Sequence, residues 1–478
     1  MKTIYPKAIS VTVYCFSLIG FTTMQIAPAK AQTFPGLPQG RQAGIFSVLA
    51  NPANLADSGK KWDVNLFAIH ASAMNNNASF SISDFGKTFN SDDLLDQVTG
   101  NNTKPTSALV SPDILGPSFM VRLNAKSAIA IHSRVRALVS VKNADGALLN
   151  EIADEEENYP LSINTAGSQL AGVHGWTEIG ASYSRNVLLN SQYKVDAGLT
   201  LKLIGGAATG YASANNINGT LDNDLQSNDG SYLQNTTGNI HFGFAGVSFD
   251  DFDNEDLVGF GNIGFGADLG ASFTWYGNNA TNKPYVFRAG LSLMDIGSIK
   301  YDADANKNGS YNININGNER FYLDAFDDVA LDEINNVFTN RPEYFTPSGT
   351  NADSHIKVSL PTRLLLDADY AVSHHFFVGF QGQFSLLKQD AAKPYNTAYY
   401  GGFALTPRFV TGAIGAALPI SYNTLSKLNV GAALQLGPVV VGSGSILSAL
   451  LGNSKQADAY FGIRFGRRIR NKVVKDNI

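Results

Sequence analysis

The chain has 478 residues with 35 basic and 40 acidic side chains, which gives a formal net charge of -5 at pH 7. Charged residues make up 16% of the chain, below the usual share of about 25%, and this weakly acidic balance excludes nucleic acid as a partner. The single cysteine, Cys15, lies in the first 31 residues, so no disulfide framework and no thiol chemistry are expected after them.

The first 31 residues have the pattern of a secretory signal peptide. Lys2 and Lys7 precede an apolar run at 8–21, and Ala29-Lys30-Ala31 is a small-x-small cleavage site. The apolar run is shorter than the roughly 20 residues that a spanning helix needs, which disfavours the alternative of a membrane anchor. We therefore expect export, and residues 1–31 are set aside from the fold.

Residues 32–61 do not alternate like a strand, and they are too apolar for a disordered tail. They combine glycines and prolines with Ile45, Phe46 and Leu55. We interpret the segment as a plug packed against the start of the following domain, with Asn51, Pro52 and Ala53 as a candidate gate. A loose N-terminal arm is the alternative.

Residues 62–466 contain about 15 segments that alternate between apolar and polar side chains, with Tyr193, Val195 and Ala197 on one side in residues 193–203 and Lys194 on the other. Most are long enough for the roughly 9–11 residues of a tilted spanning strand. They predict an all-β fold, a transmembrane antiparallel β-barrel of about 14 strands (12–16). The predicted strands cover 62–72, 79–83, 118–123, 129–141, 176–188, 193–211, 241–249, 264–276, 285–299, 364–372, 376–386, 398–409, 411–422, 428–441 and 459–465.

The apolar faces of these strands carry almost no charge, while the polar faces carry both signs. A Lys or Arg facing lipid at the bilayer midplane costs about 2–4 kcal/mol, so this division indicates lipid outside and a charged lumen inside. A soluble periplasmic β-sandwich is the alternative. The expected lumen-lining residues are Arg122, Arg134, Arg136, Asp196, Lys202, Asp268, Arg288, Asp367, Asp369 and Arg464.

The connections between strands predict short helices and two unlike ends of the barrel. Helices are expected from Asp324 to Asn336 and at 91–98, 147–157 and 445–451. Long connections at 84–115, 144–174, 212–237 and 303–360 are expected on one side, and tight turns such as 190–192 on the other. If the long connections are extracellular, the first strand would run inward and residues 32–61 would thread the lumen, unless the strand count is off by one. Residues 467–478 are expected to form a basic tail.

Two stretches resemble known outer-membrane families. Residues 40–44 (Gly-Arg-Gln-Ala-Gly), followed by Asn51-Pro52-Ala53, resemble the N-terminal region of FadL-like transporters. A longer resemblance is to a Bacteroidota-type outer-membrane barrel family of unknown function. It includes Gly116-Pro117-Ser118-Phe119, Asp295-Ile296-Gly297, Thr406-Pro407-Arg408 and Gly437-Pro438. The resemblance implies a barrel and no particular ligand.

Residues with chemical potential are few and are better explained as ordinary turns and loops. His70 and Ser72, expected on an outward face near Asn75, could form a phospholipase site, but a strand end before a turn explains them better. The run from Asp302 lacks the Gly and Glu of a calcium loop, since Lys307 and Ile313 stand there. The acidic run at 250–256 is typical of a solvated loop. We expect no enzyme activity, no cofactor and no metal site.

Two functions remain open at this point. The first is a FadL-like passive transporter of hydrophobic small molecules. The second is a structural or assembly barrel that works with a secretion or surface-attachment complex. The expected partners are outer-membrane lipid, a hydrophobic small molecule or a protein of the envelope, and the expected location is the cell outer membrane.

Overall fold

A computed structural model describes residues 34–81, 105–145, 159–165, 167–224, 230–247, 261–277, 284–327, 329, 333–349, 355–412, 414–452 and 454–469. The predicted signal peptide, the predicted helices at 91–98 and 147–157, the acidic run at 250–256 and residues 470–478 of the tail lie outside these residues.

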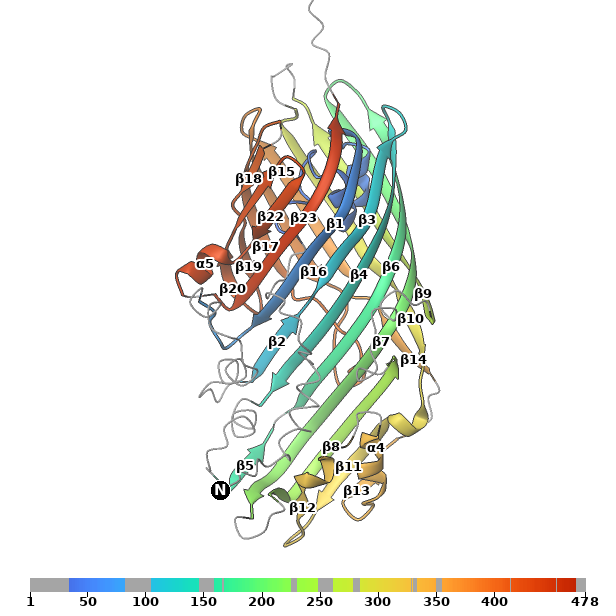
Figure 1. Ribbon diagram of the computed structural model, residues 1–478, viewed down its shortest axis with the longest axis vertical. Helices are drawn as coiled ribbons and strands as arrows, with labels where there is room; N and C mark the ends of the chain where they lie inside the picture. Colours follow the sequence, from blue (N-terminus) through green and yellow to red (C-terminus); the bar gives the residue numbers. More distant parts are fainter. Residues whose placement is uncertain are drawn as a thin grey trace, which may run out of the picture.

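The described residues form a closed antiparallel ring of fourteen strands, as the sequence predicts (Figure 1). Six of the fourteen are built from two consecutive segments each, namely β2 with β3, β5 with β6, β8 with β9, β14 with β15, β18 with β19, and β20 with β21. The ring closes where the first strand pairs with the last, with Val64 opposite Phe465. Closure removes the unpaired edges that a sheet would otherwise leave in lipid.

The ring strands begin and end as follows: β1 (Lys60–Asn75), β2 (Thr106–Val110), β3 (Asp113–Arg122), β4 (Ser127–Ala144), β5 (Leu161–Asn164), β6 (Ser168–Leu189), β7 (Tyr193–Asn223), β8 (Ser231–Gly246), β9 (Asn262–Trp275), β10 (Phe287–Asp302), β14 (His355–Ser359), β15 (Arg363–Ala371), β16 (Phe376–Ser385), β17 (Gly402–Val410), β18 (Ile414–Ala417), β19 (Ile420–Asn423), β20 (Lys427–Val430), β21 (Ala432–Leu436), β22 (Val439–Ser443) and β23 (Gln456–Arg468).

The outer face of the ring is apolar. Large side chains point outward and are exposed on strands all around the barrel, including Leu66, Ile131, Ile179, Leu201, Phe265, Leu291, Phe380, Phe403, Leu434 and Phe461. A soluble protein would not leave a belt of this extent in water. No helix of the described residues is long and apolar enough to cross a membrane. The closed ring and its apolar outer belt identify an outer-membrane β-barrel, with lipid in contact with this belt.

The wall is much taller on one side than on the other (Figure 1). β7 has 31 residues, whereas β22 has 5. Beyond the main ring, β7 and β8 continue as a sheet with β11 (Gly309–Ile315), β12 (Phe321–Tyr322) and β13 (Phe345–Pro347). The helix α4 (Ile334–Thr339) and the short turns η5 (Ala305–Lys307) and η6 (Leu323–Phe326) lie in the same region. We call this region the extension.

Two of the helices expected in the connections lie within the described residues. The helix expected from Asp324 to Asn336 is broken into η6 and α4, and the break lets Phe326 pack against Phe338 at 5.5 Å between ring centroids. Pro438 lies in the tight turn between β21 and β22. The helical turn expected at 445–451 is confirmed as α5 (Ile446–Leu450).

The direction of the first strand also differs from expectation. β1 begins beside the tight turn at 123–126 and ends beside β2, where the long connections lie. The first strand thus runs toward the long connections, and the described residues before it nevertheless lie inside the barrel. The end of β23 lies at the tight-turn end, beside Gly59, whereas Phe34 lies deeper in the barrel, against His70 and Tyr460.

Candidate functional site

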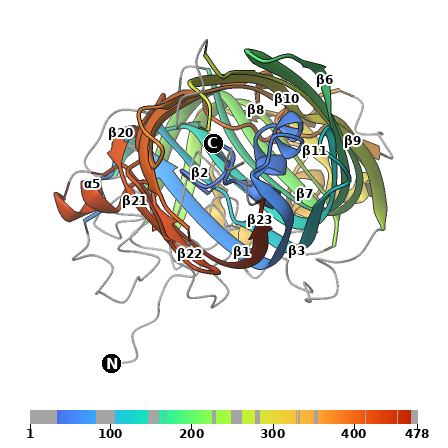
Figure 2. The same ribbon diagram turned by 90° about the horizontal axis from the view of Figure 1, so that it is seen from above.

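Residues 34–59 fill the lumen at the tight-turn end of the barrel (Figure 2). We call this segment the plug. It contains the short helical turns η1 (Gly44–Leu49) and η2 (Pro52–Leu55). Its apolar side chains, which include Phe34, Ile45, Phe46 and Leu55, pack against small and aliphatic side chains on the inner wall. The plug therefore has an apolar core of its own inside a polar lumen.

Asn51, Pro52 and Ala53 dock against glycines on neighbouring strands. A Cβ atom at Gly198 would lie 2.3 Å from the Ala53 backbone nitrogen, and one at Gly270 would lie 2.1 Å from the Asn51 Oδ1. Gly198 and Gly270 face each other in the β7–β9 register. The backbone of Pro52 and Ala53 therefore packs on the backbone at Gly198, and the Asn51 side chain packs on the backbone at Gly270, so only glycine fits at these two wall positions. Asn51 Oδ1 also accepts a hydrogen bond from Ala53 N, which caps η2.

Asp57 is the ionic anchor of the plug. The Lys194 Nζ on β7 lies 2.9 Å from its carboxylate, and Arg41 and Arg288 lie at 3.6 and 3.7 Å. Burial alone would raise the pKa of Asp57, but the charges of Arg41, Arg288 and Lys194 outweigh burial and hold it below its ordinary value. The plug is thus attached by charge as well as by packing.

Six of the expected lumen residues lie at the level of the plug. Arg464 donates to the carbonyl oxygens of Ala43 and Gln42, and Arg122 donates to that of Ser58 at the rim. Asp367 accepts from Asn51 Nδ2 at 3.3 Å. The remaining three are Asp196 beside Lys194, Arg288 beside Asp57, and Asp369 paired with Arg408.

The inward side chains of β4 show how the lumen is layered. Ala128 and Ala130 contact the plug, Arg134 and Arg136 follow, and Leu138 comes next along the strand. The lumen therefore changes from apolar to charged to apolar over a few strand positions.

The other four expected residues, Arg134, Arg136, Lys202 and Asp268, meet in the middle layer. We call this layer the charge cluster. Its members are Asp113, Arg134, Arg136, Glu178, Lys202, Asp268, Asp295 and Arg363, which are four acids and four bases, and all are buried. With all eight ionised the cluster is neutral, as a buried network needs to be.

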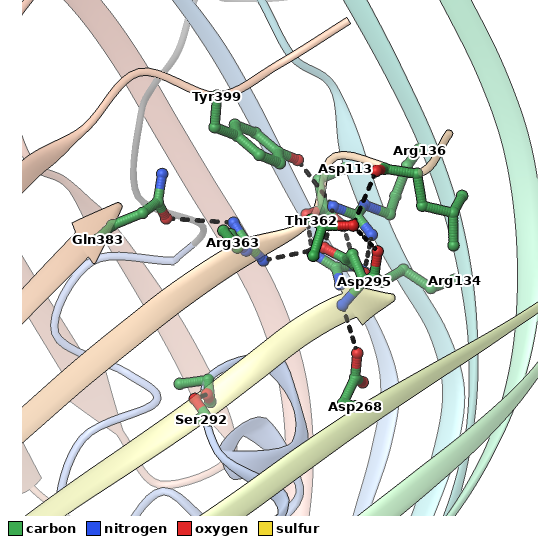
Figure 3. Close-up of polar contacts among 12 residues, drawn as sticks. Asp113, Arg134, Arg136, Asp268, Ser292, Asp295, Thr362, Arg363, Gln383 and Tyr399 are labelled. Atoms are coloured by element: carbon green, nitrogen blue, oxygen red, sulfur yellow. Dashed lines mark hydrogen bonds and ion pairs between the residues drawn. The ribbon is translucent and has the colours of Figure 1, made fainter. Parts of the chain in front are cut away.

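Asp295 is the centre of the charge cluster, where Arg136 and Arg363 approach it from different strands (Figure 3). Arg136 donates both guanidinium ends to it at 2.8 and 3.0 Å, and Lys202 Nζ lies 2.7 Å away. The Asp295 backbone nitrogen donates to Asp268 at 2.7 Å. This bidentate, many-sided pairing offsets the cost of burying the charges.

An apolar layer lies beyond the charge cluster, toward the long connections. It contains Leu138, Trp176, Ile204, Tyr301 and Tyr399, among others. Tyr399 belongs to the connection 386–401, which enters the lumen, and its hydroxyl accepts from Arg136 at 2.9 Å. Gln389 of the same connection accepts from Ser140 on β4. The lumen is thus filled by two inserted segments, the plug and residues 386–401.

Sequence reasoning missed Asp57 and Asp295. Asp295 has a positive φ of 60° and lies where the β9–β10 register shifts between Leu293 and Ile296. A bulge of this kind breaks the alternation that would have placed the side chain. The only sequence signal was its place in the stretch Asp295-Ile296-Gly297. Asp57 had no signal, because the plug has no period to follow.

The outward position expected for His70 and Ser72 is wrong. The β1–β23 register shifts between Asn65 and Phe67, so Leu66 and Phe67 both face outward. Every later residue of β1 therefore lies on the side of the wall opposite to the one that strict alternation predicts. His70 and Ser72 point into the barrel, where they are buried. Among the described residues, no group of three acidic, His or Cys side chains could hold a metal ion.

The sequence profile of a family of unknown function, DUF5723, matches residues 52–444. No curated protein matches the chain. A solved FadL homologue from Pseudomonas aeruginosa aligns over 92% of this chain and 98% of its own, with a TM-score of 0.40 and 11% identity. A mutant of the TodX monoaromatic hydrocarbon channel aligns over 93% and 100%, with a TM-score of 0.44 and 9% identity. The toluene transporter TbuX of Ralstonia pickettii aligns over 90% and 96%, with a TM-score of 0.38 and 11% identity.

Proposed function

The chain belongs to the DUF5723 family, and we propose that this member is an exported, gated barrel that passes small hydrophobic molecules by diffusion, without catalysis. The observation that carries the proposal is that chain segments, rather than the wall alone, block the lumen. Barrels of about eight strands are filled by their own side chains, and larger ones enclose cavities or channels. With the plug and residues 386–401 displaced, a fourteen-strand ring would leave a passage.

The attachment of the plug suits a gate. The plug is joined covalently to the wall only where it runs into β1, and its other links are packing, hydrogen bonds and the ion pairs of Asp57. Bonds of this kind can be exchanged with water or with other partners without breaking the wall.

A hydrophobic cargo fits the apolar layer. Trp176, Tyr301 and Tyr399 supply flat apolar surfaces, and Leu138 and Ile204 supply aliphatic ones, on the side of the lumen that faces the long connections. Binding sites for small molecules are commonly lined in this way, by apolar and aromatic side chains with a few polar groups.

A second candidate function is a structural barrel with a permanently closed lumen. The charge cluster favours it, because eight mutually paired side chains span the lumen beyond the plug. A transporter must open or bypass this network, whereas a scaffold gains from keeping it closed.

A reversible lock on the plug separates the two. Ala56 N donates to Ser184 Oγ at 3.2 Å, so cysteines at these positions (Ala56→Cys with Ser184→Cys) would join the plug to β6. The sequence after residue 31 has no other cysteine. The measurement is uptake of a fluorescent fatty acid into liposomes that contain the protein. We expect oxidation to lower uptake to the level of protein-free liposomes and dithiothreitol to restore it, while each single-cysteine variant is insensitive to both.

Equal uptake in the oxidised and reduced states would remove the plug from the gating role. No uptake in either state, together with a stoichiometric protein partner in detergent pull-downs, would replace transport with the scaffold function.

A further inference from the structure

A cavity of about 270 Å³ opens at the tight-turn end, beside the plug. Leu37, Gln39 and Gln42 of the plug line one side, and residues of β16, β17, β18, β21 and β23 line the other. Phe377 and Val410 give part of the surface an apolar character. The volume lies just below the roughly 300–1,000 Å³ range of pockets for drug-sized ligands, so only a short ligand would fit.

The lining is strongly cationic. Arg41, Arg408, Arg464 and Arg468 line the cavity, and no carboxylate of the described residues does. The acids that partly neutralise these arginines, Asp57, Asp63 and Asp369, are not part of the lining. Arg468 has no ion pair with a described residue. The lining itself thus carries four guanidinium groups and no described carboxylate, although acids behind it pair with three of the four arginines.

Buried polar groups at the cavity lack partners. Gln39 is 7% exposed, and neither its Nε2 nor its Oε1 has a hydrogen-bond partner among the described residues. The Nε atoms of Arg408 and Arg464 are also unpartnered. An unsatisfied buried polar group costs about 1–3 kcal/mol, more when charged, so several of them at one cavity need an explanation.

We propose that this cavity binds a short amphipathic molecule with a single anionic head, a carboxylate or a phosphate. The head would take hydrogen bonds from Gln39 Nε2 and the arginines, and the apolar body would lie along Leu37, Phe377 and Val410. Arginine is suited to such heads because its planar donors match both anions. The inference deepens the proposed function, on which it rests for the idea that the ligand is cargo reaching the far side of the plug.

Equilibrium binding to the full-length protein in nanodiscs tests the site at neutral pH. The probes are radiolabelled octanoate, octyl phosphate and octanol, which share a chain and differ in the head. We expect saturable binding of at least one anionic probe, and binding of octanol that is weaker by about tenfold or more, as for loss of a hydrogen bond to a charged group. The tighter of the two anions identifies the head group.

Two variants and one control locate the binding. Gln39→Leu and Arg468→Gln should each lower the affinity for the anionic probe by about tenfold. The first removes a hydrogen-bond donor from the lining, and the second removes a positive charge. Arg185→Gln removes the same charge from an exposed arginine on β6 outside the cavity and should leave binding unchanged. Heat-modifiable gel migration confirms that each variant is folded.

Octanol binding equal to that of both anions, or equal effects of Arg468→Gln and Arg185→Gln, would overturn the assignment. The two proposals also fail separately. Anion binding that persists in a protein without uptake would keep the site and reject its role in transport. Uptake without saturable binding of either anion would reject the site alone.

Discussion

The two halves of β7 contact their surroundings through different interactions: the first half through ion pairs and close backbone packing, and the second half through apolar side chains. From Tyr193 to Ile204 the strand faces the lumen with charges and glycine, and it contacts the plug through Lys194 and Gly198 and the charge cluster through Lys202. From Ala208 to Asn223 it supports the extension, where Ile217 and Leu221 join a cluster of aliphatic and aromatic side chains. In that cluster Phe338 lies 4.9 Å from Phe345 and 5.2 Å from Tyr311 between ring centroids.

The difference is one of redundancy. In the charge cluster each ion depends on particular partners, and removing one leaves another charge buried and unpaired. In the extension many apolar contacts contribute to stability, and each can be replaced by a similar one. Neighbouring side chains can therefore repack around a substitution that changes the shape of one side chain modestly. Three substitutions test this contrast.

The largest effect is expected for Asp295→Asn. Arg136, Lys202 and Arg363 would lose their shared counter-ion, and breaking such a buried pair costs about 3–5 kcal/mol. Urea titration followed by gel migration should show a much lower unfolding midpoint. Asp302→Asn, an exposed carboxylate at the end of the same strand, is the control. Equal midpoints for the two variants would mean that the cluster contributes nothing to stability.

An intermediate effect is expected for Gly198→Ala. The new Cβ would lie 2.3 Å from Ala53 N, so the plug must shift, at a cost typical of overpacking, about 1–3 kcal/mol. Limited proteolysis should cut residues 34–59 faster while the strands stay protected. At Gly382 the nearest atom to an added Cβ is 3.5 Å away, so Gly382→Ala is the matched control. A plug cut no faster than in the control would contradict close docking.

The smallest effect on the barrel is expected for Phe338→Leu. The substitution trims an aromatic ring that packs against Phe242, Tyr311 and Phe345 in the extension, at a local cost of about 1 kcal/mol. Hydrogen exchange of β11 amides should accelerate, while the urea midpoint of the barrel stays at the wild-type value. A lowered barrel midpoint would show that the extension and the ring unfold as one unit.

The fold could be predicted because the alternation of apolar and polar residues reveals where the strands lie and which side of each strand faces lipid. Leu201 and Leu203 face out and Lys202 faces in, as the period of two requires, and repetition of this pattern gave the strand number. Membership of a barrel family of unknown function was also recognisable from short stretches of sequence, and the profile match confirms it.

The rest could not be predicted, because single-residue irregularities decide it. One extra residue at Leu66 and Phe67 turns His70 inward, and a left-handed backbone places Asp295 at the centre of the charge cluster. The sequence predicts a strand from residue 398, but β17 begins at Gly402, and nothing in the sequence indicates that Tyr399 belongs to a connection that enters the lumen. Local sequence does not encode which segment a curved wall encloses.

The plug lies next to the first strand in sequence but is also held by the last. Tyr460 donates to the Pro35 carbonyl oxygen and Arg464 to that of Ala43, and both belong to β23, which closes the ring against β1. During biogenesis the binding pocket of the plug is therefore complete only after the C-terminal hairpin has arrived. The plug can then block the lumen fully only when β23 pairs with β1, so both steps occur together and late. A nascent chain stalled before β23 would expose its N-terminal segment.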